Sequence, residues 1–88
     1  LVIYGSDWPS VSPDPSPWPG IEAMVTRRNP YTNAGEQVGS EQAIRLSQAI
    51  QIYTRNGAVA MKKGDVSGSI EVGKYADFIV LDRYESFQ

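Results

Sequence analysis

Cysteine and histidine are both missing from this 88-residue sequence. Without cysteine the chain can form neither a disulfide bond nor a catalytic thiol. Without histidine it lacks the commonest metal ligand and the commonest general base. The chain by itself therefore cannot form a catalytic triad or a metal site that contains histidine.

Runs of like charge and long apolar stretches are also missing. Eight Lys and Arg residues stand against ten Asp and Glu residues, which gives a net charge of −2. This balance argues against nucleic acid and against a polybasic membrane surface as partners. No apolar stretch approaches the length of a membrane span, and no signal peptide is visible. We expect no membrane association and a cytoplasmic location.

The length allows one domain at most, because a chain of this size buries only about 60 to 65% of its unfolded surface. The first residue, Leu1, already lies in an apolar run, whereas natural termini are usually polar and loose. We therefore expect a fragment whose partner is the missing N-terminal part of the same protein. The oligomeric state stays open, and a homo-oligomer is one alternative.

The most plausible chemistry lies in the first stretch of the chain. Residues 1–4 are apolar without alternation, which predicts a strand covered on both faces, as in a parallel sheet. Asp7 would then follow the C-terminal end of that strand, where barrel and open α/β enzymes place their reacting groups. The alternative is that Asp7 is a turn former or a helix cap.

Two amphipathic helices are predicted in the middle of the chain. The first covers residues 20–28 and ends at Asn29-Pro30. The second runs from Ser47, as N-cap, to about Arg55, and Asn56-Gly57 breaks it. A turn of helix at residues 41–43 and a short helix at residues 58–61 are also expected.

The segment before the first helix, residues 9–19, contains five prolines and is predicted to be a loop. Trp8 and Trp18 bracket this loop, and each ring either walls a substrate pocket or holds the loop to the core. Arg28 lies on the apolar side of the first helix, where it could face a partner carboxylate. The alternative is structural, because a positive charge near the C-terminus of a helix interacts favourably with the helix dipole. Trp8 and Arg28 are the candidate substrate-binding residues.

From residue 67 onward the hydrophobic period changes from helical to extended. Ile70 begins a short extended piece, and Gly73 can supply the positive φ of a tight turn. Residues 78–81 predict a second buried strand. Asp77 and Asp82 flank that strand and are expected to be turn or edge residues.

Four segments form a recognisable pattern: Gly-Ser-Asp-Trp-Pro at 5–9, Thr26-Arg27, the helix with its exit over 46–58, and Gly-Ser-Ile-x-x-Gly-Lys-x-Ala-Asp within 68–82. Together they resemble the metal-dependent amidohydrolase superfamily, specifically amidohydrolase family 3, whose members include N-acyl amino acid deacylases. The last segment is shared by many branches of the superfamily, whereas the motif of Asp7 and its neighbours indicates the family 3 branch.

The resemblance implies an α/β fold, in which this chain is the C-terminal fragment of a (β/α)8 barrel with an accompanying β-sandwich. Residues 1–66 would supply strand eight, the active-site loop and the following helices. Residues 67–88 would contribute to a small sandwich that the N-terminal segment completes. The predicted strands at 1–4 and 78–81 would then lie in different layers and would not pair with each other.

The resemblance also implies a function for the longer protein. It would hydrolyse an amide or another C–N bond of a small molecule through water activated by a divalent metal, expected to be zinc. Asp7 would contact the metal and act as the general base. A His-x-His pair, further histidines and often a carboxylated lysine or another bridging ligand would come from residues before Leu1, so the fragment alone is expected to be inactive and to hold no cofactor.

Two other interpretations stay open. Some relatives carry names as regulators of exoenzyme production, so the parent could be a catalytically silent, regulatory protein. The chain could also be a self-standing domain without a function of its own. A His-x-His motif before Leu1 would favour the enzyme.

Overall fold

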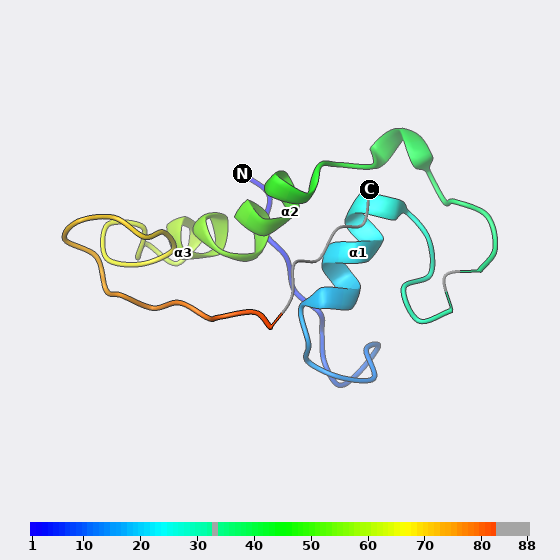
Figure 1. Ribbon diagram of the computed structural model, residues 1–88, viewed down its shortest axis with the longest axis horizontal. Helices are drawn as coiled ribbons and strands as arrows, with labels where there is room; N and C mark the ends of the chain where they lie inside the picture. The colour runs from blue at the N-terminus through cyan, green and yellow to red at the C-terminus, as the bar shows by residue number, and fades with distance from the viewer. Residues whose placement is uncertain (33, 83–88) are drawn as a thin grey trace. The chain divides into compact units, whose positions relative to one another are not determined.

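The computed structural model describes residues 1–32 and 34–82 (Figure 1). These residues form two compact units. The first unit holds residues 1–4 and 51–82, and the second unit holds residues 5–32 and 34–50. The helices of the described residues are α1 (Trp18–Thr26), a 3-10 helix η1 (Ser40–Gln42), α2 (Leu46–Tyr53) and α3 (Arg55–Ala60).

Helix α1 confirms the first predicted helix, with both of its ends shifted toward the N-terminus. It begins at Trp18 because Pro19 is tolerated in the first turn, where a backbone N–H has no helical partner. It ends before Arg27, whose left-handed φ of 57° turns the chain away while its N–H still bonds to the Ala23 carbonyl. Ile21 is buried on its inner face, with 3% of its surface exposed.

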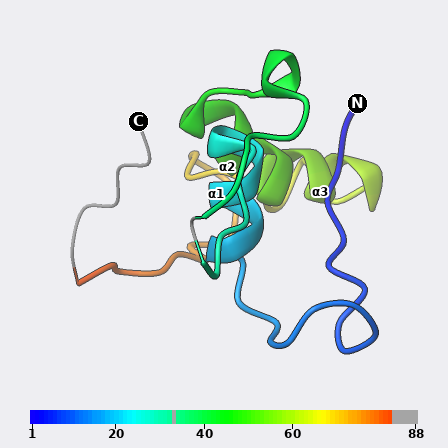
Figure 2. The same ribbon diagram turned by 90° about the vertical axis from the view of Figure 1, so that its right-hand side faces the viewer.

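The loop after α1 folds back along the helix, as Figure 2 shows for the segment that leads into η1. The Val38 N–H bonds to the Arg27 carbonyl over 2.9 Å, and the Ile44 N–H bonds to the Met24 carbonyl over 3.2 Å. The predicted turn of helix at 41–43 is confirmed as η1, one residue earlier. These bonds hold the second unit together around α1.

Helix α2 begins one residue before the predicted N-cap, so the prediction for Ser47 is wrong. The Gln48 side chain accepts a hydrogen bond from the Arg45 N–H over 3.0 Å, which is the backward half of a capping box. Arg45 thus precedes the helix, and its carbonyl accepts the N–H of Ala49. Ala49 is fully buried, as the predicted apolar face requires.

The break between α2 and α3 lies at Thr54 and not at Asn56-Gly57. Thr54 adopts φ −122° and ψ −85°, which ends α2. Asn56 and Gly57 lie at the beginning of α3, where the N–H groups of a helix lack helical partners in any case and a poor helix former costs little. The short helix predicted at 58–61 therefore exists but begins at Arg55.

Residues 1–4 and 78–81, for which buried strands were predicted, form no strand within the described part of the chain. Their side chains are exposed, from 38% for Tyr4 to 86% for Val80. A strand exists only through its hydrogen-bonded neighbours. The barrel, the β-sandwich and the boundary at residue 66 therefore stay predictions. Each helix of the described residues is too short or too polar to traverse a bilayer.

Two glycines shape the segment that follows α3. Gly73, with φ 90°, occupies the third position of a turn closed by a bond from the Lys74 N–H to the Glu71 carbonyl over 3.1 Å, which confirms the predicted tight turn. Gly68, with φ 94°, lies directly over α3, where a Cβ atom would come within 2.7 Å of the Ala58 Cβ. The chain can pass this close to the helix only with glycine at position 68.

We expect Gly68→Ala to destabilise the protein by about 1 to 3 kcal/mol, because it combines a strained φ with a steric clash against α3. The matched control is Gly57→Ala. Gly57 is helical, and a methyl group added there would meet no other atom within 4 Å, so this substitution should stabilise by about 0.5 to 1 kcal/mol. Urea denaturation measures the free energy of unfolding of both variants. If the two substitutions changed it in the same direction, the expectation would be contradicted.

Candidate functional site

Asp7 lies in a sharp turn that it closes with its backbone and not with its side chain. The Asp7 carbonyl accepts the Ser10 N–H over 2.8 Å, and the Ser6 hydroxyl accepts the Trp8 N–H over 3.1 Å. Asp7 itself has a φ of 54°, an uncommon conformation that Asp tolerates better than most residues. Its exposed carboxylate has no hydrogen-bond partner among the described residues.

A second aspartate of the same loop shows the bonding that Asp7 lacks. The Asp14 carboxylate accepts the Ser16 N–H over 2.8 Å, which is the side-chain turn expected of a structural aspartate. Helix α1 has no side-chain cap at its N-terminus, so Asp7 does not cap it either. The Asp7 carboxylate therefore neither caps α1 nor accepts a turn hydrogen bond among the described residues, whereas the residue itself takes part in the turn through its backbone.

The residues described here do not fit a complete metal site. They contain no cluster of three or more His, Cys, Asp or Glu side chains that could hold a metal ion. Catalytic zinc takes three protein ligands and structural zinc takes four, mostly from histidine and cysteine. Asp7 could supply one oxygen donor to a site whose other ligands lie elsewhere.

We expect the 88-residue chain alone to bind zinc weakly, because one carboxylate without imidazole or thiolate neighbours is a poor site for this ion. Calorimetric titration at neutral pH would measure the affinity, with Asp7→Asn as the comparison. A single stoichiometric site of submicromolar affinity that Asp7→Asn abolishes would contradict this expectation.

The two candidate substrate-binding residues are placed differently from Asp7. The Trp8 ring is 51% exposed beside the turn. Arg28 was considered as a partner for a carboxylate, but its Nη1 donates to the Gly35 carbonyl over 2.9 Å. The reason is that the chain leaves α1 at Arg27 and folds back, which brings loop carbonyls within reach of the Arg28 side chain. The structure shows no contact that joins Arg28 to Asp7 or Trp8 within the described residues.

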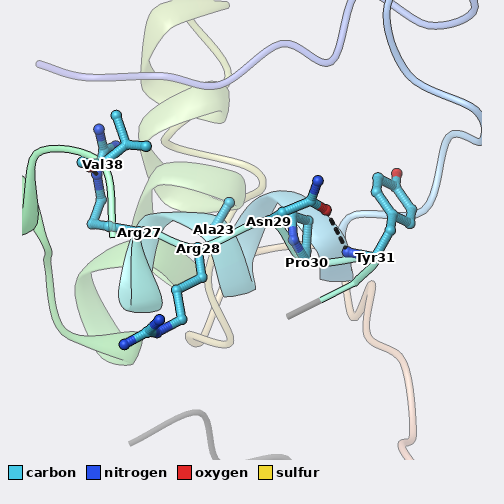
Figure 3. A pocket seen from close by; sticks show the side chains of 7 residues that line it. All are labelled: Ala23, Arg27, Arg28, Asn29, Pro30, Tyr31 and Val38. Carbon is cyan, nitrogen blue, oxygen red and sulfur yellow. Dashed lines mark hydrogen bonds between the residues drawn. The ribbon is translucent and has the colours of Figure 1, made fainter. Parts of the chain in front are cut away.

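A shallow pocket lies beside the C-terminal end of α1 (Figure 3). Arg27 extends along Val38, whose carbonyl accepts its Nε–H over 2.8 Å, whereas Arg28 points in another direction. The Asn29 carboxamide oxygen accepts the Tyr31 N–H over 2.9 Å. The lining residues are Ala23, Arg27, Arg28, Asn29, Pro30, Tyr31 and Val38. Both arginines thus hold loop carbonyls and do not converge on a ligand.

A polar cluster that the sequence patterns did not predict lies on the Gly73 turn. Lys74 Nζ contacts the Glu71 carboxylate at 2.9 Å and the Ser69 hydroxyl at 2.7 Å, and Arg55 Nη1 lies 3.7 Å from the same carboxylate. The Ser69 hydroxyl donates to Glu71. This hydrogen bond and the Lys74 ammonium lower the pKa of Glu71. The spacing of Glu71 and Lys74 around a turn glycine is the signal that could have predicted the pair.

We expect Glu71→Gln to remove an acid-sensitive part of the stability. The folded pKa of Glu71 lies below its unfolded value of about 4.3, so its contribution is complete above that value and is lost as pH falls through the folded pKa. Urea denaturation at about pH 3 and about pH 6 would measure the loss. Between the higher and the lower of these pH values, the free energy of unfolding should fall further for the wild type than for Glu71→Gln.

Glu36→Gln is the matched control for this pH experiment, because Glu36 forms no ion pair with any residue that the structure describes. It should leave the pH dependence unchanged. An equal effect of both substitutions would show that net charge alone, and not the cluster around Glu71, sets the acid sensitivity.

The segment that leads into Asp7 is held by two contacts in the first unit. The Tyr4 and Tyr53 rings stack with their centroids 4.3 Å apart and an interplanar angle of 25°. Such a pair contributes about 0.5 to 1.5 kcal/mol beyond the area it buries. The Asn56 Nδ2 donates to the Val2 carbonyl over 2.8 Å. Burial raises the pKa of the Tyr53 phenol, and the Tyr4 phenol acts in the same direction.

Comparisons with known proteins place the chain in a family. The family model described as "Amidohydrolase family" matches residues 1–88. The chain is 37% identical to an N-substituted formamide deformylase of Arthrobacter pascens over 93% of its own length and 14% of that protein. It is 32% identical to the putative amidohydrolase YtcJ of Bacillus subtilis over 92% of its length and 15% of that protein.

A third relative matches over a shorter stretch. Imidazolonepropionase of Bacteroides fragilis is 51% identical over 39 residues, which is 44% of this chain and 9% of that protein. No solved structure matches the chain. This chain thus spans only a small share of the length of each of these three relatives. The family model matches all 88 residues, and the chain therefore belongs to the amidohydrolase family.

Proposed function

We propose that the protein of which this chain is a part hydrolyses an amide or another C–N bond of a small molecule, with Asp7 as a metal-contacting general base. The amidohydrolase family match over residues 1–88 supports the reaction class. The names of two similar proteins, a formamide deformylase and an imidazolonepropionase, fit the same class. The chain covers 14% of the first of them, so the remaining ligands and most of the substrate site would lie outside these residues.

The proposal is carried by the Asp7 carboxylate, which has no hydrogen-bond partner within the part of the chain that the structure describes. Ser6 and the backbone of Asp7 form the turn, so the carboxylate is not needed for local structure. A residue held in a sparsely populated backbone conformation, with φ 54°, persists where the surrounding structure determines it, and such residues cluster at active sites. Asp14, in the same loop, makes the ordinary structural bond instead.

The chemistry that a divalent metal would supply is a bound water whose pKa is lowered to about 7. Asp7 can provide one oxygen donor and can accept a proton on its other carboxylate oxygen. The same oxygen can return the proton to a leaving amine, so one residue would serve as base and then as acid. The exposed Trp8 ring beside it is available to cover one side of a small substrate.

N-substituted formamides are the first substrate class to test, because the relative that matches 93% of this chain is named for them. N-acyl amino acids are the second class, since the motifs of this chain resemble N-acyl amino acid deacylases. The assay on the full-length protein should detect the released amine and the released acid separately. Release of both in equal amounts is the expected result.

In the full-length protein, we expect Asp7→Asn to lower turnover by roughly 10²- to 10⁴-fold, because the amide cannot accept the proton. The measurement is kcat on the substrate found in that screen, with the metal content and the thermal midpoint of each variant determined in parallel. Asp14→Asn is the matched control and should leave kcat unchanged, because it replaces a structural carboxylate of the same loop. An Asp7→Asn enzyme within a few-fold of the wild type would remove Asp7 from the catalytic role.

A further inference from the structure

We propose that Ser6 is a positioning residue for Asp7, because its hydroxyl holds the backbone from which the Asp7 carboxylate projects. This role rests on the proposed function of Asp7 and adds the side chain that determines how the carboxylate is presented. The residues concerned are 6–10, which all belong to the second unit. The observation behind the proposal is the hydrogen bond from the Trp8 N–H to the Ser6 hydroxyl over 3.1 Å.

Two hydrogen bonds fix the backbone of Asp7 from both sides. The bond between the Ser6 hydroxyl and the Trp8 N–H spans Asp7 and constrains its φ and ψ. The bond from the Ser10 N–H to the Asp7 carbonyl, over 2.8 Å, fixes the peptide that follows. Because φ and ψ are the only soft backbone dihedrals of a residue, the two bonds together determine the direction in which the Asp7 side chain leaves the backbone.

The conformation of Asp7 depends on such support. Its φ of 54° lies in the left-handed region, which residues other than glycine adopt uncommonly. A residue in this region persists where the surrounding structure determines it. Among the described residues, Ser6 makes the side-chain hydrogen bond that supports this turn. Removing a hydrogen bond of this kind shifts a conformational equilibrium by about 2- to 12-fold, so Asp7 would leave this conformation more often without the Ser6 hydroxyl.

The position of a proline explains why Asp7 does not support the turn with its own carboxylate. An aspartate in a turn ordinarily accepts the backbone N–H two residues further on, as Asp14 does from Ser16. The corresponding residue after Asp7 is Pro9, which has no N–H. After Asp14 the proline comes one position earlier, which leaves the N–H of Ser16 available. The turn therefore takes its side-chain acceptor from the residue before Asp7, and the carboxylate is not drawn into it.

The same local bond occurs a second time in the loop and provides a matched control. The Ser16 hydroxyl accepts the Trp18 N–H over 3.4 Å, again two residues further on. Ser16→Ala therefore removes the same kind of bond without changing the Asp7 turn. Ser6→Thr keeps a hydroxyl acceptor, and Ser6→Asn offers an amide oxygen that can accept the same N–H. These variants separate the hydrogen bond from the general effect of a substitution in the loop.

The first experiment measures kcat and KM of the full-length enzyme on the formamide or acyl amino acid that it hydrolyses. Ser6→Ala should lower kcat by about 3- to 10-fold, with KM within about twofold of the wild type. Ser6→Thr and Ser16→Ala should retain wild-type kcat, and Ser6→Asn should have a higher kcat than Ser6→Ala. Equal kcat values for Ser6→Ala and Ser16→Ala would overturn the proposal. Losses in Ser6→Thr and Ser6→Asn as large as in Ser6→Ala would also overturn it, because the acceptor would then not matter.

A double-mutant cycle tests whether Ser6 acts through Asp7. In an Asp7→Asn background, Ser6→Ala should produce less than about a 1.5-fold further loss of kcat, because the group that it positions is already disabled. A further loss as large as in the wild-type background would show that Ser6 acts independently of Asp7 and would overturn the proposal. If Asp7→Asn alone had no effect, the proposed function of Asp7 would fail instead, and the cycle distinguishes these cases.

Residue-resolved hydrogen exchange gives a readout that does not depend on activity. In the full-length protein, Ser6→Ala should accelerate exchange of the Trp8 and Ser10 amides by at least about threefold. The Ser10 amide is the decisive probe, because its N–H bonds to the Asp7 carbonyl and responds when the Asp7 backbone moves. Ser16→Ala should leave both amides unchanged. Unchanged exchange of the Ser10 amide in Ser6→Ala would show that the Ser6 bond does not hold Asp7, and it would overturn the proposal whatever the activity assay gives.

Discussion

The scarcity of buried apolar surface is the constraint on which the described structure depends. Among the described residues, Ile21 and Ala49 are the only hydrophobic side chains that are buried. With so small a core, each unit is held largely by directed bonds to backbone carbonyls. Arg27, Arg28 and Asn56 each donate to such a carbonyl. These bonds require particular donors at particular positions, so charged residues of this chain have structural roles that their charge alone does not suggest.

Two other carboxylates of the described residues differ from Asp7 in their bonding. Asp14 and Glu71 accept hydrogen bonds from neighbouring groups and stabilise the local turn. Asp7 lies in a turn that Ser6 and the backbone already complete. Asp7 combines a carboxylate without a hydrogen-bond partner among the described residues with an uncommon backbone conformation, which is consistent with a requirement for that carboxylate elsewhere. The family match supports this interpretation independently, because it rests on sequence and not on the turn.

Local patterns predicted most of the helices, whereas their ends depended on contacts between distant residues. The apolar period placed α1, α2 and the short α3 within two or three residues of where they lie. The N-cap prediction for Ser47 was wrong because the Gln48 side chain bonds back to the Arg45 N–H and the helix begins at Leu46. Residue propensity does not decide which of several neighbouring residues precedes the first turn of a helix. The predicted tight turn at Gly73 was confirmed, because positive φ is a local property of glycine.

The sequence by itself determined the family, the absence of histidine and cysteine, and the position of Asp7 after an apolar run, because these are properties of residue order and composition. Only the tertiary structure decided that the Asp7 carboxylate has no hydrogen-bond partner in residues 1–32 and 34–82, that Arg28 bonds to a loop carbonyl, and that Tyr53 stacks on Tyr4. The last of these contacts joins residues 49 positions apart in the chain. No periodicity encodes such a pair, because it depends on where the helices place their side chains after the chain has folded.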